Sequence, residues 1–195
     1  MFDASILTGP VANAPVADTF NRALERDYST GDIPHVLVSS FVWNVPGANR
    51  WTVAAVVNAQ SGVSVAVTQA TNFNAFAGFG TQRPNLVRNP ELPAGQRTVE
   101  RWFDTSAFTV APQFTIGSSP RNPVRGPSYR NVDVAVSHRA PFNHGAALEL
   151  RAEIFNLLNT PPLSAPNGVL GAANFGTITG AGDPRVIQLS AKVVF

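Results

Sequence analysis

The sequence predicts an all-β fold of antiparallel strands joined by short turns and long irregular connections. Two observations support this prediction: several segments alternate apolar and polar residues, and 15 glycines and 16 prolines interrupt a chain of 195 residues. Alternation with period two marks a strand with one apolar and one polar face. Residues 18–30 alone suggest a helix, capped by Asp18, with Phe20 and Leu24 on one face.

Five full strands are expected, in two groups. The first group is a long hairpin around Pro46 and Gly47, in which Gly62 interrupts the second strand before Val63, Val65 and Val67 resume the alternation. The second group has the clearest alternation and occupies the last seventy residues. The five strands, and a partial sixth, cover residues 33–45, 50–70, 128–140, 146–158, 185–195 and 1–9.

The composition excludes several classes of protein. Charged residues make up 13% of the chain, about half the usual share. Apolar runs are far shorter than the roughly 20 residues of a membrane-spanning helix. The chain has no cysteine, which rules out disulfides and zinc–cysteine sites. A net charge of +2 gives little support to nucleic-acid binding.

The apolar face of each strand could pack into a soluble sandwich or face lipid in a membrane barrel. Three features favour the barrel. The last two strands have about the 9–11 residues of a tilted spanning strand, and short connections alternate with long ones such as 71–127. The chain also stops on an aromatic residue in phase with the apolar face, as in strands that the barrel-assembly machinery recognises. This expected assembly signal comprises Ile187, Leu189, Ala191, Val193 and Phe195.

The chain resembles the C-terminal part of the Oar-like group of TonB-dependent outer-membrane transporters. Six segments carry the resemblance, and they follow one another in the same order as in that family. The most specific combination is RAEIFNLLNTP followed by FGTIT, AGDPR and a terminal Phe. The six segments are GDIPHVLVSSFVWNVPG (31–47), WTVAAVVNAQSGVSVAVTQATN (51–72), RWFDTSAF (101–108), SPRNPVRGPSYRNVDVAVSH (119–138), LELRAEIFNLLNTP (148–161) and FGTITGAGDPRVIQLSAKVVF (175–195).

The resemblance implies a 22-stranded barrel in the outer membrane of a Gram-negative type bacterium, closed around a plug and energised through TonB. Five or six strands do not close such a barrel, because strand number fixes its diameter. Residues 1–195 are therefore expected to be a C-terminal fragment of the barrel domain, inactive in transport when isolated. The expected partners are outer-membrane lipid, the assembly machinery, the rest of the barrel and plug, and TonB through the missing N-terminal part.

The resemblance also implies roles for charged residues. The expected lumen-facing residues are Asp133, Glu149, Arg151, Glu153, Gln188 and Lys192. Arginines of the long outer loop are candidates to bind a ligand or the phosphates of lipopolysaccharide: Arg83, Arg88, Arg97, Arg101, Arg121 and Arg125. The alternatives are a nucleic acid or other anionic ligand, and a structural role in which arginines pack on aromatic residues.

No pattern of catalytic residues is found. Glu149 and Glu153 would lie roughly 13 Å apart on a strand, with Arg151 between them, so a compensating charge ladder is favoured over an acid–base pair. His35, His138 and His144 have no partner at metal-ligand spacing. The sequence therefore predicts no enzyme activity, metal or cofactor. A soluble all-β module that binds a carbohydrate or an anion remains the alternative function.

Overall fold

The computed structural model describes residues 21–47, 50–74, 81–142 and 145–195. These residues form two compact units. The loop unit comprises the described residues within 21–33, 62–127 and 164–180, and the sheet unit those within 34–61, 128–163 and 181–195.

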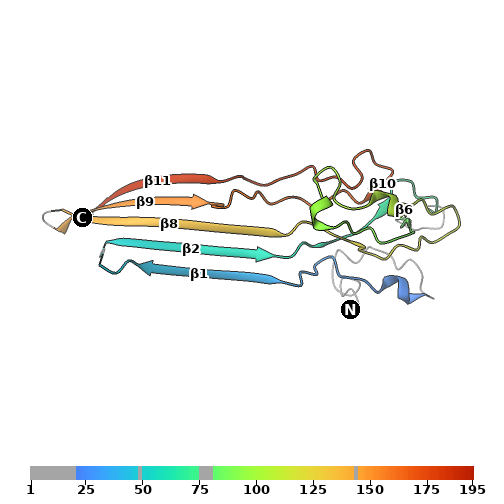
Figure 1. Ribbon diagram of the computed structural model, residues 1–195, viewed down its shortest axis with the longest axis horizontal. Helices are drawn as coiled ribbons and strands as arrows, with labels where there is room; N and C mark the ends of the chain where they lie inside the picture. The colour runs from blue at the N-terminus through green and yellow to red at the C-terminus, as the bar shows by residue number, and fades with distance from the viewer. Residues whose placement is uncertain (1–20, 48–49, 75–80, 143–144) are drawn as a thin grey trace. The chain divides into compact units, whose positions relative to one another are not determined.

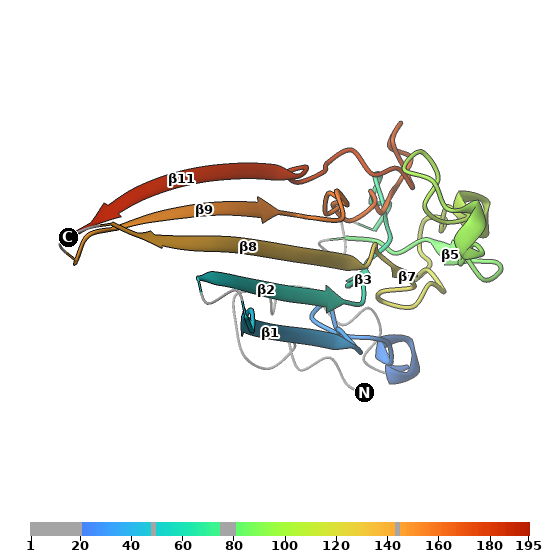
Figure 2. The same cartoon turned by 60° about the vertical axis from the view of Figure 1, so that its left-hand side comes forward.

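The sheet unit is built on one five-stranded antiparallel sheet in the order β1-β2-β8-β9-β11 (Figure 1). A second view shows the five strands side by side in the same order (Figure 2). This confirms the all-β prediction, and four of the five expected strands occur within a few residues of their predicted ends. The strands are β1 (Val36–Asn44), β2 (Trp51–Gln60), β8 (Tyr129–Pro141), β9 (Ala147–Phe155) and β11 (Val186–Val194).

The connections of the sheet fall into two classes at its two ends. Short turns join β1 to β2 and β8 to β9, and the strand registers place both turns at one end of the sheet. Long connections leave the other end, between β2 and β8 and between β9 and β11. The predicted alternation of short and long connections is therefore confirmed.

The predicted strand 50–70 is wrong beyond Gln60. A Cβ at Gly62 would lie 1.9 Å from the carbonyl oxygen of Gly126, so the close approach of these two backbones requires glycine. Beyond this point the chain pairs with different segments. Short strand β3 (Ser64–Val65) pairs with β7 (Val124–Arg125), and β4 (Thr68–Gln69) pairs in parallel with β10 (Val169–Leu170).

The long connection 71–127 packs against the other two segments of the loop unit. Three aromatic rings meet edge to face: Phe103 lies 5.8 Å from Phe108 and 5.2 Å from Phe175 between ring centroids. Val67 and Val124 complete this buried cluster, so the valine alternation after Gly62 serves the loop core. The remaining elements are β5 (Asn85–Leu86), β6 (Phe108–Thr109), and the 3₁₀ turns η4 (Ala94–Gln96) and η5 (Thr105–Ala107).

The helix predicted over 18–30 is also wrong within the described residues. Only a single 3₁₀ turn forms, η2 (Arg22–Glu25), and the Asn21 side chain does not cap it. Tertiary contacts hold this segment instead. Arg83 donates to the Leu24 carbonyl and to the Glu25 carboxylate. The proposed cap Asp18 and the partial strand 1–9 lie outside the described residues.

Both edges of the sheet are open within the part of the chain that the structure describes. Strands β1 and β11 each have one hydrogen-bonded neighbour in the sheet. Because neighbouring strands are antiparallel throughout, the first and fifth strands run in the same direction. An open edge presents unpaired N–H and C=O groups, which lipid cannot satisfy.

Candidate functional site

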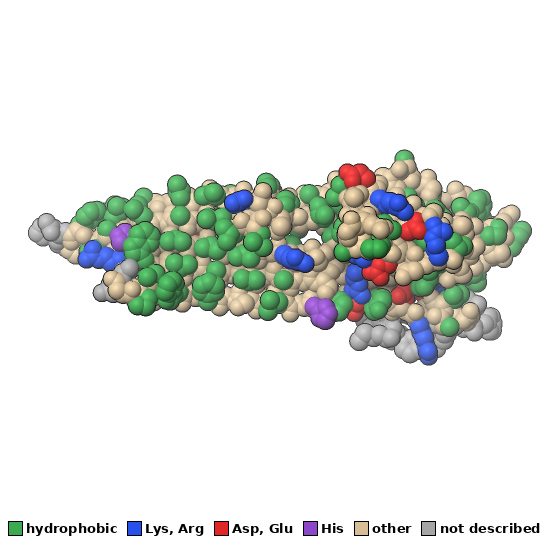
Figure 3. All heavy atoms as spheres, in the orientation of Figure 1, with side chains coloured by type: hydrophobic (Ala, Val, Ile, Leu, Met, Phe, Trp, Pro, Cys, Tyr) green, Lys and Arg blue, Asp and Glu red, His purple; other side chains and the backbone are tan. Residues whose placement is uncertain are grey.

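One face of the five-stranded sheet is mostly apolar, and its polar members are Ser39, Arg130 and His138. Residues paired across neighbouring strands point to the same side, so the printed registers assign every side chain to a face. Hydrophobic side chains cover the strands on the face drawn in Figure 3. The apolar face carries Leu37, Phe41, Trp43, Trp51, Val53, Ala55, Val57, Val132, Val134, Val136, Leu148, Leu150, Ala152, Ile154, Ile187, Leu189, Ala191 and Val193.

The apolar side chains of the two edge strands β1 and β11 are exposed, whereas most of those on the central strands are half-buried and Ala55 is buried. Leu189, at the middle of β11, has 77% of its surface exposed, and Trp43 and Trp51 are exposed beside the short β1–β2 turn. Phe195, the last residue of the expected assembly signal, follows β11 and is almost fully exposed. A continuous apolar surface across a five-stranded sheet indicates contact with an apolar environment.

The opposite face of the sheet holds all six residues expected to face a lumen. The registers place Asp133, Glu149, Arg151, Glu153, Gln188 and Lys192 together on this side. Charges of opposite sign stand in register: Arg139 pairs with Glu149, which pairs with Lys192. Cross-strand pairs of opposite charge stabilise the pairing of neighbouring strands. Strand β1 departs from the pattern, since Val36, Val38 and Val42 lie on this face too.

The charge ladder on β9 is compensated within the strand. The Arg151 guanidinium donates to Glu153 Oε1 at 2.7 Å. Because this pairing occupies Glu153, the geometry supports a compensating charge ladder over an acid–base pair. The residues that the structure describes contain no group of histidines and carboxylates able to hold a metal ion. His138 instead packs its ring against Trp51, with 4.5 Å between centroids.

The segment FNLLN forms a fixed turn at the end of β9. Asn156 and Asn159 both have positive φ, 53° and 52°, which asparagine tolerates better than most residues. The Asn156 backbone N–H donates to Asp133 Oδ1 on β8, and its side-chain oxygen accepts from the Thr160 N–H. Asn159 Oδ1 accepts from the Arg185 N–H ahead of β11. This motif therefore ties three neighbouring strands together at the start of a long connection.

Replacing Asn156 by Ala should lower the free energy of unfolding of the sheet by about 1–3 kcal/mol, because it removes the side-chain hydrogen bonds to Thr160 and Asp183 and places Ala at a positive φ. Chemical denaturation in detergent micelles measures this loss. Asn156→Gly separates the two causes, since Gly keeps the positive φ without strain but also loses the side-chain bonds. We expect the Gly variant to lose less than the Ala variant. Wild-type stability in both would show that this turn does not hold the sheet.

The six arginines proposed to contact ligand all pair with carboxylates of the loop unit. Arg83 lies 2.6 Å from Glu25, with 11% and 7% of the two side chains exposed. Both Arg83 and Arg121 are thus too buried to meet a lipopolysaccharide surface. The pairs are Arg83 and Arg121 with Glu25, Arg88 and Arg101 with Asp104, Arg97 with Glu91, and Arg125 with Asp32. This geometry supports the structural alternative for these arginines.

Asp104 is the most strongly held carboxylate of this network. Hydrogen bonds from the Ser106 hydroxyl and the Arg88 guanidinium lower the pKa of Asp104 from its usual 3.8 to about 2. A lowered folded-state pKa means that the ionised form stabilises the fold. This contribution is fully present above pH 3.8 and is lost as the pH falls to about 2.

Asp104→Asn should therefore make the free energy of unfolding of the loop unit less dependent on pH at acidic pH. We expect the wild-type protein to lose loop-unit stability between about pH 4 and pH 2, and the variant to be less stable at neutral pH but less sensitive to acid. Hydrogen exchange of the 81–127 amides across this pH range measures both effects. Glu100→Gln is the matched control at an exposed carboxylate, and an equal change there would contradict the role of Asp104.

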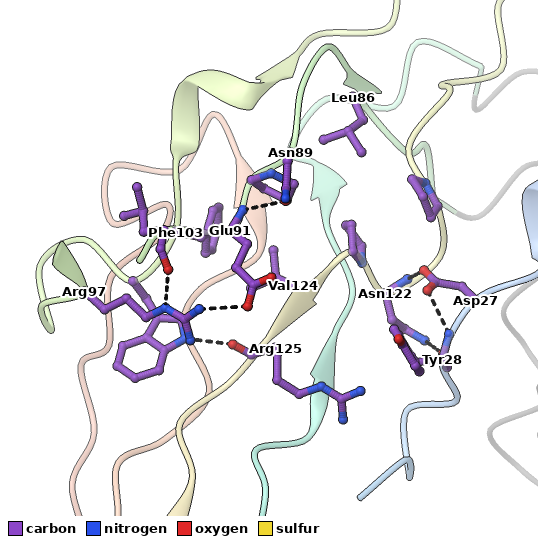
Figure 4. A pocket seen from close by; sticks show the side chains of 15 residues that line it. Asp27, Tyr28, Leu86, Asn89, Glu91, Arg97, Phe103, Asn122, Val124 and Arg125 are labelled. Carbon is purple, nitrogen blue, oxygen red and sulfur yellow. Dashed lines mark hydrogen bonds and ion pairs between the residues drawn. The ribbon is translucent and has the colours of Figure 1, made fainter. Parts of the chain in front are cut away.

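A pocket of about 510 Å³ opens within the loop unit. Figure 4 shows its walls, with Tyr28, Asp27 and Asn122 on one side and Arg97 and Glu91 on the other. Sequence reasoning missed this pocket, because its walls come from segments far apart in the chain. The proline-rich segment PRNPVRGP (120–127) was the available signal, since five of its residues line the pocket: Pro120, Asn122, Pro123, Val124 and Arg125.

Comparison with known family models identifies the family of this chain. The family model described as an outer membrane beta barrel domain matches residues 2–188. The chain belongs to this family of outer-membrane β-barrels. It is accordingly an outer-membrane protein of a Gram-negative bacterium, and its apolar sheet face fits lipid contact. This membership favours the barrel over the soluble binding module.

Two further comparisons, with curated proteins and with solved structures, found no match. Within the described residues, no helix combines the length and the hydropathy needed to cross a bilayer.

Proposed function

We propose that this chain forms the C-terminal strands of a TonB-dependent transporter barrel of the Oar-like group. The observation that carries the proposal is the sheet itself, with an exposed apolar face, a charge-paired polar face and two open edges. Bacterial outer-membrane barrels have an even number of antiparallel strands. Since β1 and β11 run in the same direction, an odd number of further strands would close such a barrel.

The proposal gives each surface a partner. The apolar face contacts outer-membrane lipid, and the barrel-assembly machinery inserts the strands. The open edges of β1 and β11 pair with the rest of the barrel. The polar face meets the water-filled lumen and the plug, through which TonB acts. The proposed role is transport of a substrate; it involves no catalysis, no cofactor and no nucleic acid.

Semi-native electrophoresis tests the larger barrel. An antibody against residues 83–104 is used on outer membranes of cells that make the protein, with boiled and unboiled samples. We expect a band far larger than 20.7 kDa whose mobility changes on boiling. A boiling-insensitive band of 20.7 kDa in the soluble fraction would contradict the proposal.

The TonB step needs its own test. The native protein, purified from outer membranes, should bind the immobilised periplasmic domain of TonB, whereas residues 1–195 produced alone should not. The isolated chain serves as the matched control because it carries the same strands. If the native protein fails to bind TonB, the barrel assignment stands and the transporter assignment is wrong.

A further inference from the structure

The pocket of the loop unit has the size of a small-molecule site. Its volume of about 510 Å³ falls in the range of roughly 300–1,000 Å³ typical of ligand pockets. Every lining residue belongs to the loop unit. Neither the arginine–carboxylate pairs of the loop unit nor the comparisons with known proteins give this pocket a function.

Flat rings form two of its walls. Tyr28 is 57% exposed and is held in place by Arg125, whose guanidinium lies 4.7 Å from the ring centroid. Trp102 is fixed by a bond of 2.8 Å from its indole N–H to the Arg125 carbonyl. Pro90 and Pro123 add further ring surfaces to the lining. Rings fixed in this way offer apolar contact area at little entropic cost.

Each of the two arginines that line the pocket is paired with a carboxylate. Arg97 lies 2.8 Å from Glu91, and Arg125 lies 2.8 Å from Asp32. Asp27 accepts hydrogen bonds from the backbone N–H groups of Tyr28 and Asn122. Both lining arginines are therefore engaged, and a strongly anionic ligand would have to break these pairs. The pocket suits a ligand without net charge.

One lining residue has an unused hydrogen-bond acceptor. Asn122 is 2% exposed, and its side-chain nitrogen donates to the Tyr28 carbonyl at 2.6 Å. Its Oδ1 atom is buried and has no hydrogen-bond partner among the described residues. A buried acceptor without a partner is costly, but this oxygen is closed to solvent and a ligand in the pocket does not reach it. The exposed amide of Asn89 and the carboxylate of Glu91 instead offer acceptors at the same pocket.

We propose that this pocket binds a neutral saccharide. A sugar ring has an apolar C–H face, which would pack on Tyr28 or Trp102, and an edge of hydroxyl groups, which would bond to the exposed Asn89 and Glu91. A neutral sugar needs no counter-charge, which matches the paired arginines. Binding at this pocket goes beyond the proposed transport role, because it requires neither TonB nor a closed barrel.

Saturation-transfer NMR on the native protein tests the proposal. The protein is held in an amine-oxide detergent without a sugar headgroup, and the probes are maltohexaose, cellohexaose and xylohexaose. We expect saturable binding of at least one probe, with little change in affinity between about 0.05 and about 0.5 M salt. Tyr28→Ala should weaken binding about tenfold or more, whereas Phe114→Ala, an exposed aromatic of the same unit outside the pocket, should change it less than about twofold.

Three results would overturn the proposal: no saturable binding of any probe, equal affinity in Tyr28→Ala and wild-type protein, or affinity that collapses with salt. Asn89→Ala provides a second variant at an exposed side chain if Tyr28→Ala disturbs folding, which near-ultraviolet circular dichroism reports. These outcomes leave the binding of TonB by the native protein unaffected. Failure of the saccharide site is therefore distinguishable from failure of the transporter assignment.

Discussion

Leu189→Arg should lower the free energy of unfolding of the membrane-inserted protein by about 2–4 kcal/mol, the cost of a cation at the lipid face near the bilayer midplane. Leu189 lies in the middle of β11, in register with Ala152 on the apolar face, and is 77% exposed. Nothing in the sheet would shield the guanidinium from lipid. The loss is measured by urea unfolding in vesicles and by the fraction of heat-modifiable protein in the outer membrane.

Gln188→Arg is the matched control for this substitution. It introduces the same side chain one residue earlier, in register with Glu153 on the polar face. A lumen-facing arginine next to a carboxylate should be tolerated within about 1 kcal/mol. Equal losses in the two variants would mean that β11 does not separate lipid from water.

Phe103→Ala should have the largest effect on the loop unit, a loss of about 3–5 kcal/mol. Phe103 is the largest fully buried side chain of that unit, and its ring contacts Phe108 and Phe175 edge to face. Removing it leaves a cavity where segments from three parts of the chain meet. Hydrogen exchange and limited proteolysis of residues 81–127 report the loss.

Phe114→Ala serves as the control for this cavity. Phe114 belongs to the same unit but is largely exposed, so its truncation should change stability by less than about 0.5 kcal/mol. We expect the exchange of β8, β9 and β11 amides to change little in Phe103→Ala. Uniform destabilisation of the sheet would contradict a separate loop core.

The strands were predictable because a sheet between an apolar and a polar environment alternates its residues with a period of two. Leu148 to Ile154 and Ile187 to Val193 alternate without interruption, and both segments form strands where expected. The same signal misled at Gly62. Val63, Val65 and Val67 continue the alternation, but the pairing partner changes from β1 and β8 to β7. Periodicity reports which side of a strand is apolar and carries no information on the strand with which it pairs.

The pairing of the arginines and the pocket could not be predicted for a related reason. Arg83 reaches Glu25 across 58 positions, and Asn122 reaches Tyr28 across 94. The stretch from Arg83 to Arg130 has an excess of arginines over acids, and the resemblance implied a ligand or the phosphates of lipopolysaccharide as their partner. The acids that neutralise the excess lie partly outside the stretch, as Glu25 and Asp32 do. Only the fold brings them together.

A cysteine scan of β11 tests the central claim, that one face of the sheet contacts outer-membrane lipid and the other contacts water. The chain has no cysteine, so each single substitution from Val186 to Val194 takes one nitroxide label. Relaxation by oxygen, which partitions into lipid, is compared with relaxation by an aqueous nickel complex, with the native protein in vesicles. We predict alternation with period two, in which labels at 187, 189, 191 and 193 respond to oxygen and labels at 188, 190 and 192 respond to nickel. Equal access of the nickel complex to both sets would contradict the account.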